Sequence, residues 1–144
     1  MVLFTIGFGQ KSARQFFTLL QENKVTRVID IRLNNSSQLA GYTKKPDLEF
    51  FLQAIAGIDY IHIEDFAPTK EIMDVYKNKR TDWQTYKKQY MELLAARKPL
   101  EKMDPNIFHG ACLLCSEPTA EQCHRSLLAE YLTAAIPDVR IVHL

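Results

Sequence analysis

The sequence predicts an α/β fold, a Rossmann-like three-layer sandwich in which helices cover both faces of a mostly parallel sheet of about five strands. Short apolar segments alternate with longer amphipathic segments almost throughout the 144 residues, which is typical of βαβ units. Segment 110–115 is apolar at nearly every position, as expected for a central strand buried on both faces. The length and the 47% hydrophobic content favour one domain over residues 1–144.

The predicted strands are short apolar or β-branched runs bounded by glycine, charged or turn-forming residues. The first run lies at the N-terminus and lacks a basic leader, so we expect a strand there rather than a signal peptide. In chain order, the predicted strands are residues 2–6, 27–31, 58–63, 110–115 and 139–144.

The predicted helices follow capping residues and carry apolar residues at helical spacing. Segment 33–46, rich in Asn, Ser, Gly and Lys, predicts a mobile loop. Segment 68–105 contains two predicted helices and no strand, which indicates a helical insertion or flap. Capping-box pairs or single capping residues mark the five helix starts: Ser12 with Gln15, Asp47, Thr69, Thr81 with Gln84, and Thr119 with Gln122.

Charge and cysteine content limit the classes of function. Eighteen basic and seventeen acidic residues leave a net charge of +1, which provides no overall field to attract a polyanion. No apolar run approaches the roughly 20 residues of a membrane helix, so no membrane association is expected. Three cysteines, at spacings unlike a disulfide framework, favour the reducing cytoplasm. The sequence gives no indication of the oligomeric state.

Polar residues follow several of the predicted strands. In an open parallel sheet, ligands bind outside the carboxyl ends of the strands, so residues that are scattered in the sequence converge on one rim. The residues expected there are Gly7, Phe8 and Gly9; Asp30 and Arg32; His62, Glu64 and Asp65; and Cys115 and Glu117.

Motifs along essentially the whole chain resemble a known family. The most specific are Cys115-Ser116-Glu117 and Cys123-His124-Arg125, and the others are Thr5-Ile6-Gly7, Asp30-Ile31-Arg32, residues 57–62 and residues 142–144. With these motifs the chain resembles the bacterial and archaeal family called domain of unknown function 488. The resemblance implies this fold and a site around the two Cys-containing motifs, and it implies no particular reaction.

The Cys-His-Arg motif is expected at the start of the last helix. With Thr119 as the N-cap, Cys123 is the fourth helical residue, and a helix start favours anions. Arg125 adds a planar guanidinium suited to phosphate or carboxylate, and Arg32 can approach from the neighbouring strand. We therefore expect Arg32, Arg125, Cys123 and His124 to contact a small anionic substrate. In the alternative interpretation, each arginine pairs internally, with Asp30 or with Glu117.

His124 falls in the helical register of Leu127, Leu128 and Tyr131. This register places it near the middle of the buried helix face, with Cys123 and Arg125 on opposite sides of it. A packed, hydrogen-bonded histidine is therefore favoured over a directly catalytic one.

The thiols and carboxylates supply the candidates for the chemical step. Cys112 and Cys115 are three apart on a strand and point to opposite faces, so they are not expected to bind one metal ion together and no metal site is predicted. No other cofactor is predicted. Cys115 lies at a strand end near a helix start, which lowers a thiol pKa, although a buried structural cysteine is the favoured interpretation. Asp30 and Glu117 are candidate general bases, and Glu117 would share the face of Cys115 on a continued strand.

Three functional hypotheses follow, and the sequence does not decide whether the protein is an enzyme. The first is an enzyme acting on a small anionic substrate at the rim. The second is a non-catalytic module for nucleic acid or protein, because lysines interleave with aromatic residues in and near segment 68–105; the alternative is that Trp83, Tyr86 and Tyr90 form a helical core. The third is thiol chemistry at Cys115.

Overall fold

Five parallel strands form the sheet of the computed structural model, which describes residues 1–35, 41–117 and 119–144. Their order in the sheet is β3-β2-β4-β1-β5, and the predicted parallel sheet is confirmed. Each strand lies within a residue or two of its predicted position: β1 (Val2–Gly7), β2 (Arg27–Asp30), β3 (Asp59–His62), β4 (Ala111–Cys115) and β5 (Arg140–His143).

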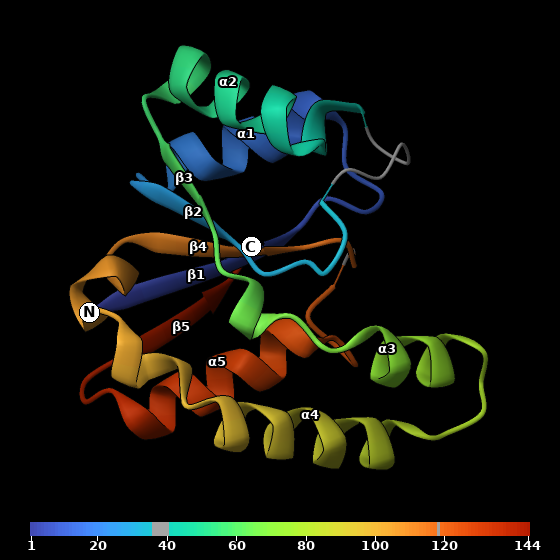
Figure 1. The fold of residues 1–144 in the computed structure, drawn as a ribbon. Helices are drawn as coiled ribbons and strands as arrows, with labels where there is room; N and C mark the ends of the chain where they lie inside the picture. Colours follow the sequence, from blue (N-terminus) through green and yellow to red (C-terminus); the bar gives the residue numbers. More distant parts are fainter. Residues whose placement is uncertain (36–40, 118) are drawn as a thin grey trace.

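Helices cover both faces of the sheet, as predicted for three layers (Figure 1). One face carries α1 (Ala13–Glu22) and α2 (Lys45–Ala56), and the other carries α5 (His124–Ala135), with α4 (Trp83–Arg97) packed beside it. The short helix α3 (Lys70–Lys77) runs next to α4. Short 3-10 helices are η1 (Gly41–Thr43), η2 (Glu64–Phe66), η3 (Pro99–Lys102) and η4 (Pro105–Phe108).

The central strand β4 divides its side chains between two apolar cores. Cys112 and Leu114 pack with α1 and α2, whereas Leu113 and Cys115 pack with α4 and α5. Each of these four residues is fully buried, which explains why the strand is apolar at every position. Cys112 and Cys115 therefore lie on opposite faces of the sheet, as strand geometry predicted.

The predicted insertion 68–105 contains α3 and α4, and aromatic side chains pack between these helices. The rings of Trp83 and Tyr86 stack at a centroid distance of 5.5 Å, and that of Tyr76 lies 4.6 Å from Tyr86. Tyr90 is fully buried, and its hydroxyl donates to the carbonyl of Phe66 at 2.6 Å. The interpretation of these aromatic residues as a helical core is confirmed.

Helix starts are the part of the fold that the sequence predicted least well. The Ser12–Gln15 capping box and the Thr69 cap are confirmed. The predicted Thr81 cap is wrong, because Asp82 caps α4 and its carboxylate accepts a hydrogen bond from the amide of Thr85 at 2.8 Å. The predicted Asp47 cap is also wrong, because α2 begins at Lys45. Of the predicted loop 33–46, residues 36–40 lie outside the described part of the chain.

The Thr119–Gln122 capping box is also wrong, and this correction changes the site. Helix α5 begins at His124 with Cys123 as its N-cap. Gln122 has a φ of 48°, outside the helical range, so the chain cannot run as a helix from Thr119 through this residue. Cys123, His124 and Arg125 are thus the cap and the first two residues of the helix rather than its fourth to sixth.

The end of β1 lies against the loop that follows β4. The amides of Phe8 and Gly9 donate to the carbonyls of Cys115 and Ser116 at 3.2 and 2.9 Å. A Cβ atom on Gly7 would overlap the carbonyl oxygen of Glu117 and lie 2.6 Å from Nη1 of Arg125. The absence of a side chain at Gly7 therefore lets the two loops meet.

Replacing Gly7 by alanine should lower the free energy of unfolding by roughly 3 kcal/mol, because the added methyl group must displace the backbone of Glu117. Urea denaturation monitored by circular dichroism measures the effect. Gly41→Ala is the matched control, since no described atom lies within 4 Å of its added Cβ. Equal unfolding midpoints for the two variants would contradict the proposed close packing.

Candidate functional site

The carboxyl ends of the strands bring the predicted polar residues to one rim. In the register of the sheet, Gly7 is opposite Cys115, and Asp30 is opposite both Leu114 and His62. The predicted convergence of these strand ends is therefore present in the structure. The rim contains two groups of polar side chains, one built on Asp30 and the other on the start of α5.

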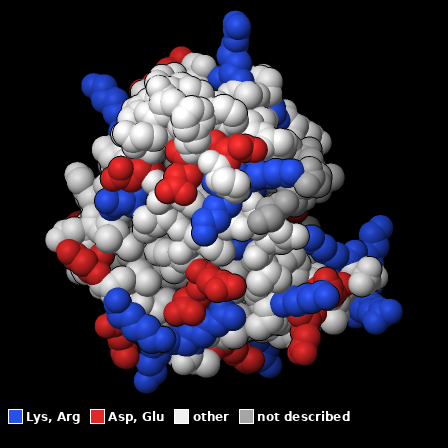
Figure 2. All heavy atoms as spheres, turned by 45° about the horizontal axis from the view of Figure 1, so that its top comes forward, with Lys and Arg blue, Asp and Glu red and all other residues white. Residues whose placement is uncertain are grey.

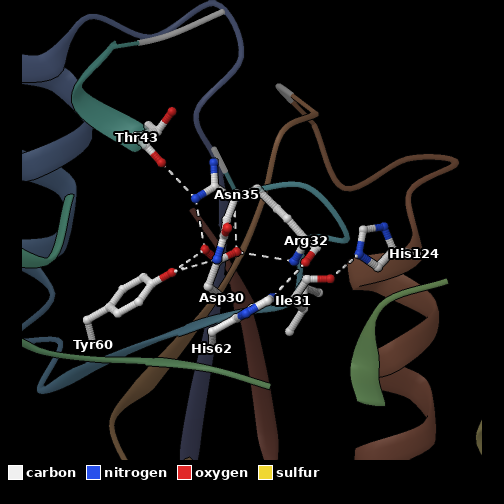
Figure 3. A network of polar contacts seen from close by, with 8 residues as sticks. All are labelled: Asp30, Ile31, Arg32, Asn35, Thr43, Tyr60, His62 and His124. Atoms are coloured by element: carbon white, nitrogen blue, oxygen red, sulfur yellow. Dashed lines mark hydrogen bonds and ion pairs between the residues drawn. The ribbon is translucent and has the colours of Figure 1, made fainter. Parts of the chain in front are cut away.

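Asp30 is the centre of the first group (Figure 3). Its side chain is fully buried, and its two carboxylate oxygens accept from Nε and Nη2 of Arg32 at 2.8 Å each. Nη2 of Arg32 also donates to the carbonyl of Thr43 at 2.7 Å. Arg32 thus has the internal partner of the alternative interpretation, and a ligand that used these two nitrogens would have to break a buried ion pair.

Aromatic residues complete the surroundings of this ion pair. The hydroxyl of Tyr60 donates to Asp30 Oδ2 at 2.6 Å, and the guanidinium of Arg32 lies 5.4 Å from the ring centroid of Phe8. Burial, and then the hydrogen bond to Asp30, raise the pKa of Tyr60 above its usual value. Sequence reasoning missed Tyr60, although its position on the predicted strand 58–63 was a usable signal.

His124 links the start of α5 to strand β2. Its Nε2 donates to the carbonyl of Ile31 at 3.0 Å, and its ring meets that of Tyr90 edge-on at 5.8 Å. Burial lowers the pKa of His124 to about 4, so the ring is neutral at pH 7. Because Nε2 holds the proton, Nδ1 is a hydrogen-bond acceptor.

Arg125, rather than His124, lies at the centre of the buried face of α5. Arg125 is fully buried, in the helical register of Leu128, Ala129 and Leu132, whereas His124 remains partly exposed. Sequence reasoning misplaced them because it counted Tyr131, which is only partly buried, in the buried face and so centred that face on His124. Nη1 of Arg125 donates to the carbonyl of Glu117 at 3.5 Å, and its Nε and Nη2 have no hydrogen-bond partner among the described residues. Burying a cation with so few hydrogen bonds is costly, so nearby negative charge would stabilise Arg125.

Two cysteine thiols lie beside this guanidinium. The Sγ atoms of Cys115 and Cys123 are 3.0 Å apart, and both cysteines are free and almost completely buried. Burial raises the pKa of Cys115, but the hydrogen bond from Cys123 and the charge of Arg125 outweigh burial and leave this pKa below its usual value. The hydrogen bond to Cys115 and burial raise the pKa of Cys123. Of the two thiols, Cys115 is therefore the one that loses its proton more readily.

Glu117 differs from its predicted arrangement. Strand β4 ends at Cys115, so the two residues do not continue along one strand face. The Glu117 side chain is exposed, and its backbone carbonyl, 4.0 Å from Sγ of Cys115, is the group that faces the thiol. The backbone carbonyl of Glu117 contacts both the Cys115 thiol and the Arg125 guanidinium, whereas its carboxylate is exposed.

A cavity of about 370 Å³ opens between the start of α5 and the insertion. The motif residues on its lining are Ser116, Glu117, Cys123 and His124, whereas the insertion contributes Met73, Tyr76, Lys77, Lys79, Thr81 and Tyr86. Segment 68–105 therefore forms one wall of the site. Sequence reasoning did not assign α3 this role, because the signal available, a polar-aromatic helix, does not indicate what the helix faces.

On the face shown in Figure 2, basic and acidic side chains are interspersed. Within residues 1–35, 41–117 and 119–144, no three His, Cys, Asp or Glu side chains gather as metal ligands would. The cavity is therefore the feature from which a function can be proposed.

Comparison with known proteins gives one family. The model of the family described as "Domain of unknown function DUF488" matches residues 12–132. No curated protein and no solved structure matches the sequence. Among the helices that the structure describes, none combines the length and apolar character needed to cross a bilayer.

Replacing Asp30 by asparagine should lower the free energy of unfolding by about 3–5 kcal/mol, because it leaves the buried charge of Arg32 unpaired. The control is Asp59→Asn, which breaks an ion pair with Arg27 in which the aspartate side chain is 64% exposed. The control should cost less than about 1 kcal/mol. Chemical denaturation of both variants gives the comparison, and similar losses would show that Asp30–Arg32 is no stronger than a surface pair.

The partly buried imidazole of His124 predicts a pH dependence of stability. Between about pH 6.5 and the folded pKa of about 4, the unfolded chain binds a proton at His124 that the folded chain does not. Stability should therefore fall as the pH is lowered through this window, by at most about 3 kcal/mol, since part of the ring is exposed.

His124→Gln should flatten this part of the stability profile, whereas replacing the exposed His109 by glutamine should leave it unchanged. Denaturant titrations at several pH values measure the difference. Parallel profiles for wild type and His124→Gln would show that His124 titrates equally in both states.

Proposed function

The chain belongs to the DUF488 family, whose model covers residues 12–132, and we propose that it is an enzyme that binds a small anionic substrate at the strand rim. The observation that carries this proposal is the cavity of about 370 Å³, in which Glu117, Cys123 and His124 of the two motifs line the wall opposite two lysines of the insertion. A phosphate-bearing metabolite, such as a nucleotide, is the substrate class that fits.

The electrostatic surroundings of the cavity support an anion. Lys77 and Lys79 line it and are exposed, and the amino-terminal end of α5 contributes the positive end of its dipole. The full charge of Arg125 lies behind this helix start. Glu117 is the acidic side chain on the lining, so positive groups predominate. The volume suits a small ligand, because ligand cavities usually range over about 300–1,000 Å³.

The candidate groups for the chemical step divide by access. Glu117 and His124 line the cavity, and the neutral His124 has an unprotonated Nδ1, so either can accept a proton from a bound substrate. Asp30 is fully buried and bonded to Arg32, which suits a positioning role through Ile31 and His124. In this proposal, Cys123 contacts the substrate from the cavity wall and Cys115 lies behind it.

Isothermal titration calorimetry with inorganic phosphate and with a nucleoside monophosphate tests the proposal. Removing both lysines, as Lys77→Gln with Lys79→Gln, should weaken binding about tenfold or more, equivalent to roughly 1.4 kcal/mol. The control is Lys87→Gln with Lys88→Gln on α4, which removes the same charge outside the cavity lining. Absence of binding to the wild type, or equal loss in both double variants, would contradict the proposed cavity site.

The alternative function is a nucleic-acid-binding module, which a separate titration with an oligonucleotide tests. Binding of a single-stranded oligonucleotide that weakens steeply with salt, and is lost when Lys79 and Arg80 are neutralised, would favour that class. The rings of Tyr76, Trp83 and Tyr86 argue against it, because they pack against one another instead of being available for bases to stack on.

A further inference from the structure

Cys115 and Cys123 are placed to react with each other. Their Sγ atoms are 3.0 Å apart, only about 1 Å longer than a disulfide bond. Cys115 is the last residue of β4 and Cys123 is the N-cap of α5, and both belong to the core that these two elements share, so the packing of that core holds the two thiols together. We propose that this pair is a reversible dithiol–disulfide couple that exchanges with small organic disulfides.

The surroundings of the pair favour the thiolate that such exchange requires. Sγ of Cys123 accepts from the amide of Arg125 at 3.5 Å, and the guanidinium of Arg125 is fully buried with Nε and Nη2 unpartnered among the described residues. In the proposed couple the two sulfurs share one proton, and their single negative charge offsets this cation. Cys112 offers a contrast within the same protein, since burial raises its thiol pKa and it lies on the opposite face of the sheet.

Access decides which sulfur reacts first. Cys123 lines the cavity, whereas Cys115 is fully buried behind it. An incoming disulfide therefore meets Cys123, and Cys115 is positioned to complete the exchange. Cys123 is 3% exposed, so the cavity admits a small disulfide more readily than a protein.

The proposed exchange is a two-electron transfer in which the one proton of the pair leaves with the first thiol released. The shared proton moves to Cys115, and the Cys123 thiolate attacks one sulfur of the disulfide R–S–S–R, forming a mixed disulfide and releasing RS⁻. Cys115 gives its proton to this RS⁻, which leaves as RSH. The Cys115 thiolate then attacks Sγ of Cys123, forms the internal disulfide and releases the second RS⁻. The protein thiol and thiolate are oxidised to a disulfide, and the substrate disulfide is reduced to one thiol and one thiolate, which takes its proton from the solvent.

Oxidation also changes the balance of charge around Arg125. The internal disulfide carries no negative charge, so the guanidinium loses its counter-charge and remains buried. This cost favours the reduced pair and makes its disulfide readily reducible, as in proteins whose reduced form is stabilised by a thiolate. The couple is then suited to reversible exchange rather than to a permanent structural cross-link.

Thiol counting on the unmodified protein tests the proposal. The reduced protein is equilibrated with hydroxyethyl disulfide, a small uncharged reagent, then denatured, alkylated and weighed by mass spectrometry. Of the three free cysteines, only Cys112 should remain alkylatable, with a peptide linking Cys115 to Cys123. Cys112→Ala is the control and should form the same linked peptide. Three alkylatable thiols after equilibration, in protein that circular dichroism shows to be folded, would overturn the couple.

Single variants test the order of attack. Cys115→Ser should retain a mixed disulfide on Cys123, whereas Cys123→Ser should form an adduct at least tenfold more slowly, because neither of its two remaining thiols lines the cavity. Adducts forming at equal rates would overturn the assigned order.

In the wild type, the pH profile of alkylation should have its midpoint below the ordinary thiol pKa of about 8.5, and a midpoint at or above that value would overturn the shared thiolate. Neither result depends on Lys77 or Lys79, so anion binding can fail separately.

Discussion

The buried guanidinium of Arg125 is the constraint on which the arrangement of the rim depends. It lies between the end of β1 and the loop after β4, where Gly7 has no side chain to collide with it. The carbonyl of Glu117 accepts one of its hydrogen bonds. A cation in this position must be offset by nearby negative charge, and the thiol pair of Cys115 and Cys123 is the group that can supply it.

The rim therefore contains two buried arginines that differ in how their charge is balanced. Arg32 is balanced by Asp30 through two hydrogen bonds of 2.8 Å, and Tyr60 stabilises the same carboxylate. This first group is internally complete and positions Ile31 and His124. Arg125 has no carboxylate in this position and leaves two of its nitrogens unbonded within the described part of the chain. Incomplete compensation makes the second group the place where chemistry or a ligand is expected.

The helical insertion forms one wall of the cavity beside the start of α5. The ring of Tyr76 packs against that of Tyr86 and holds α3 against α4, and the hydroxyl of Tyr90 attaches α4 to the carbonyl of Phe66. These contacts place Tyr76, Lys77 and Lys79 opposite the start of α5. The aromatic residues are thus part of the core, and they serve the site by holding its wall in position.

The sequence by itself determined the α/β class, the approximate strands, the separation of Cys112 from Cys115 and the convergence of polar residues at the strand ends. These features follow from local patterns, because apolar runs and two-residue alternation are properties of each segment alone. Only the tertiary structure decided the strand order, the late start of α5, the burial of Arg125 and the contact between Cys115 and Cys123. Thr119 and Gln122 have the spacing of a capping box, but the left-handed backbone of Gln122 starts the helix at His124. A helix start depends on contacts from distant segments, here Gly7 and Glu117 around Arg125, and local spacing does not contain them.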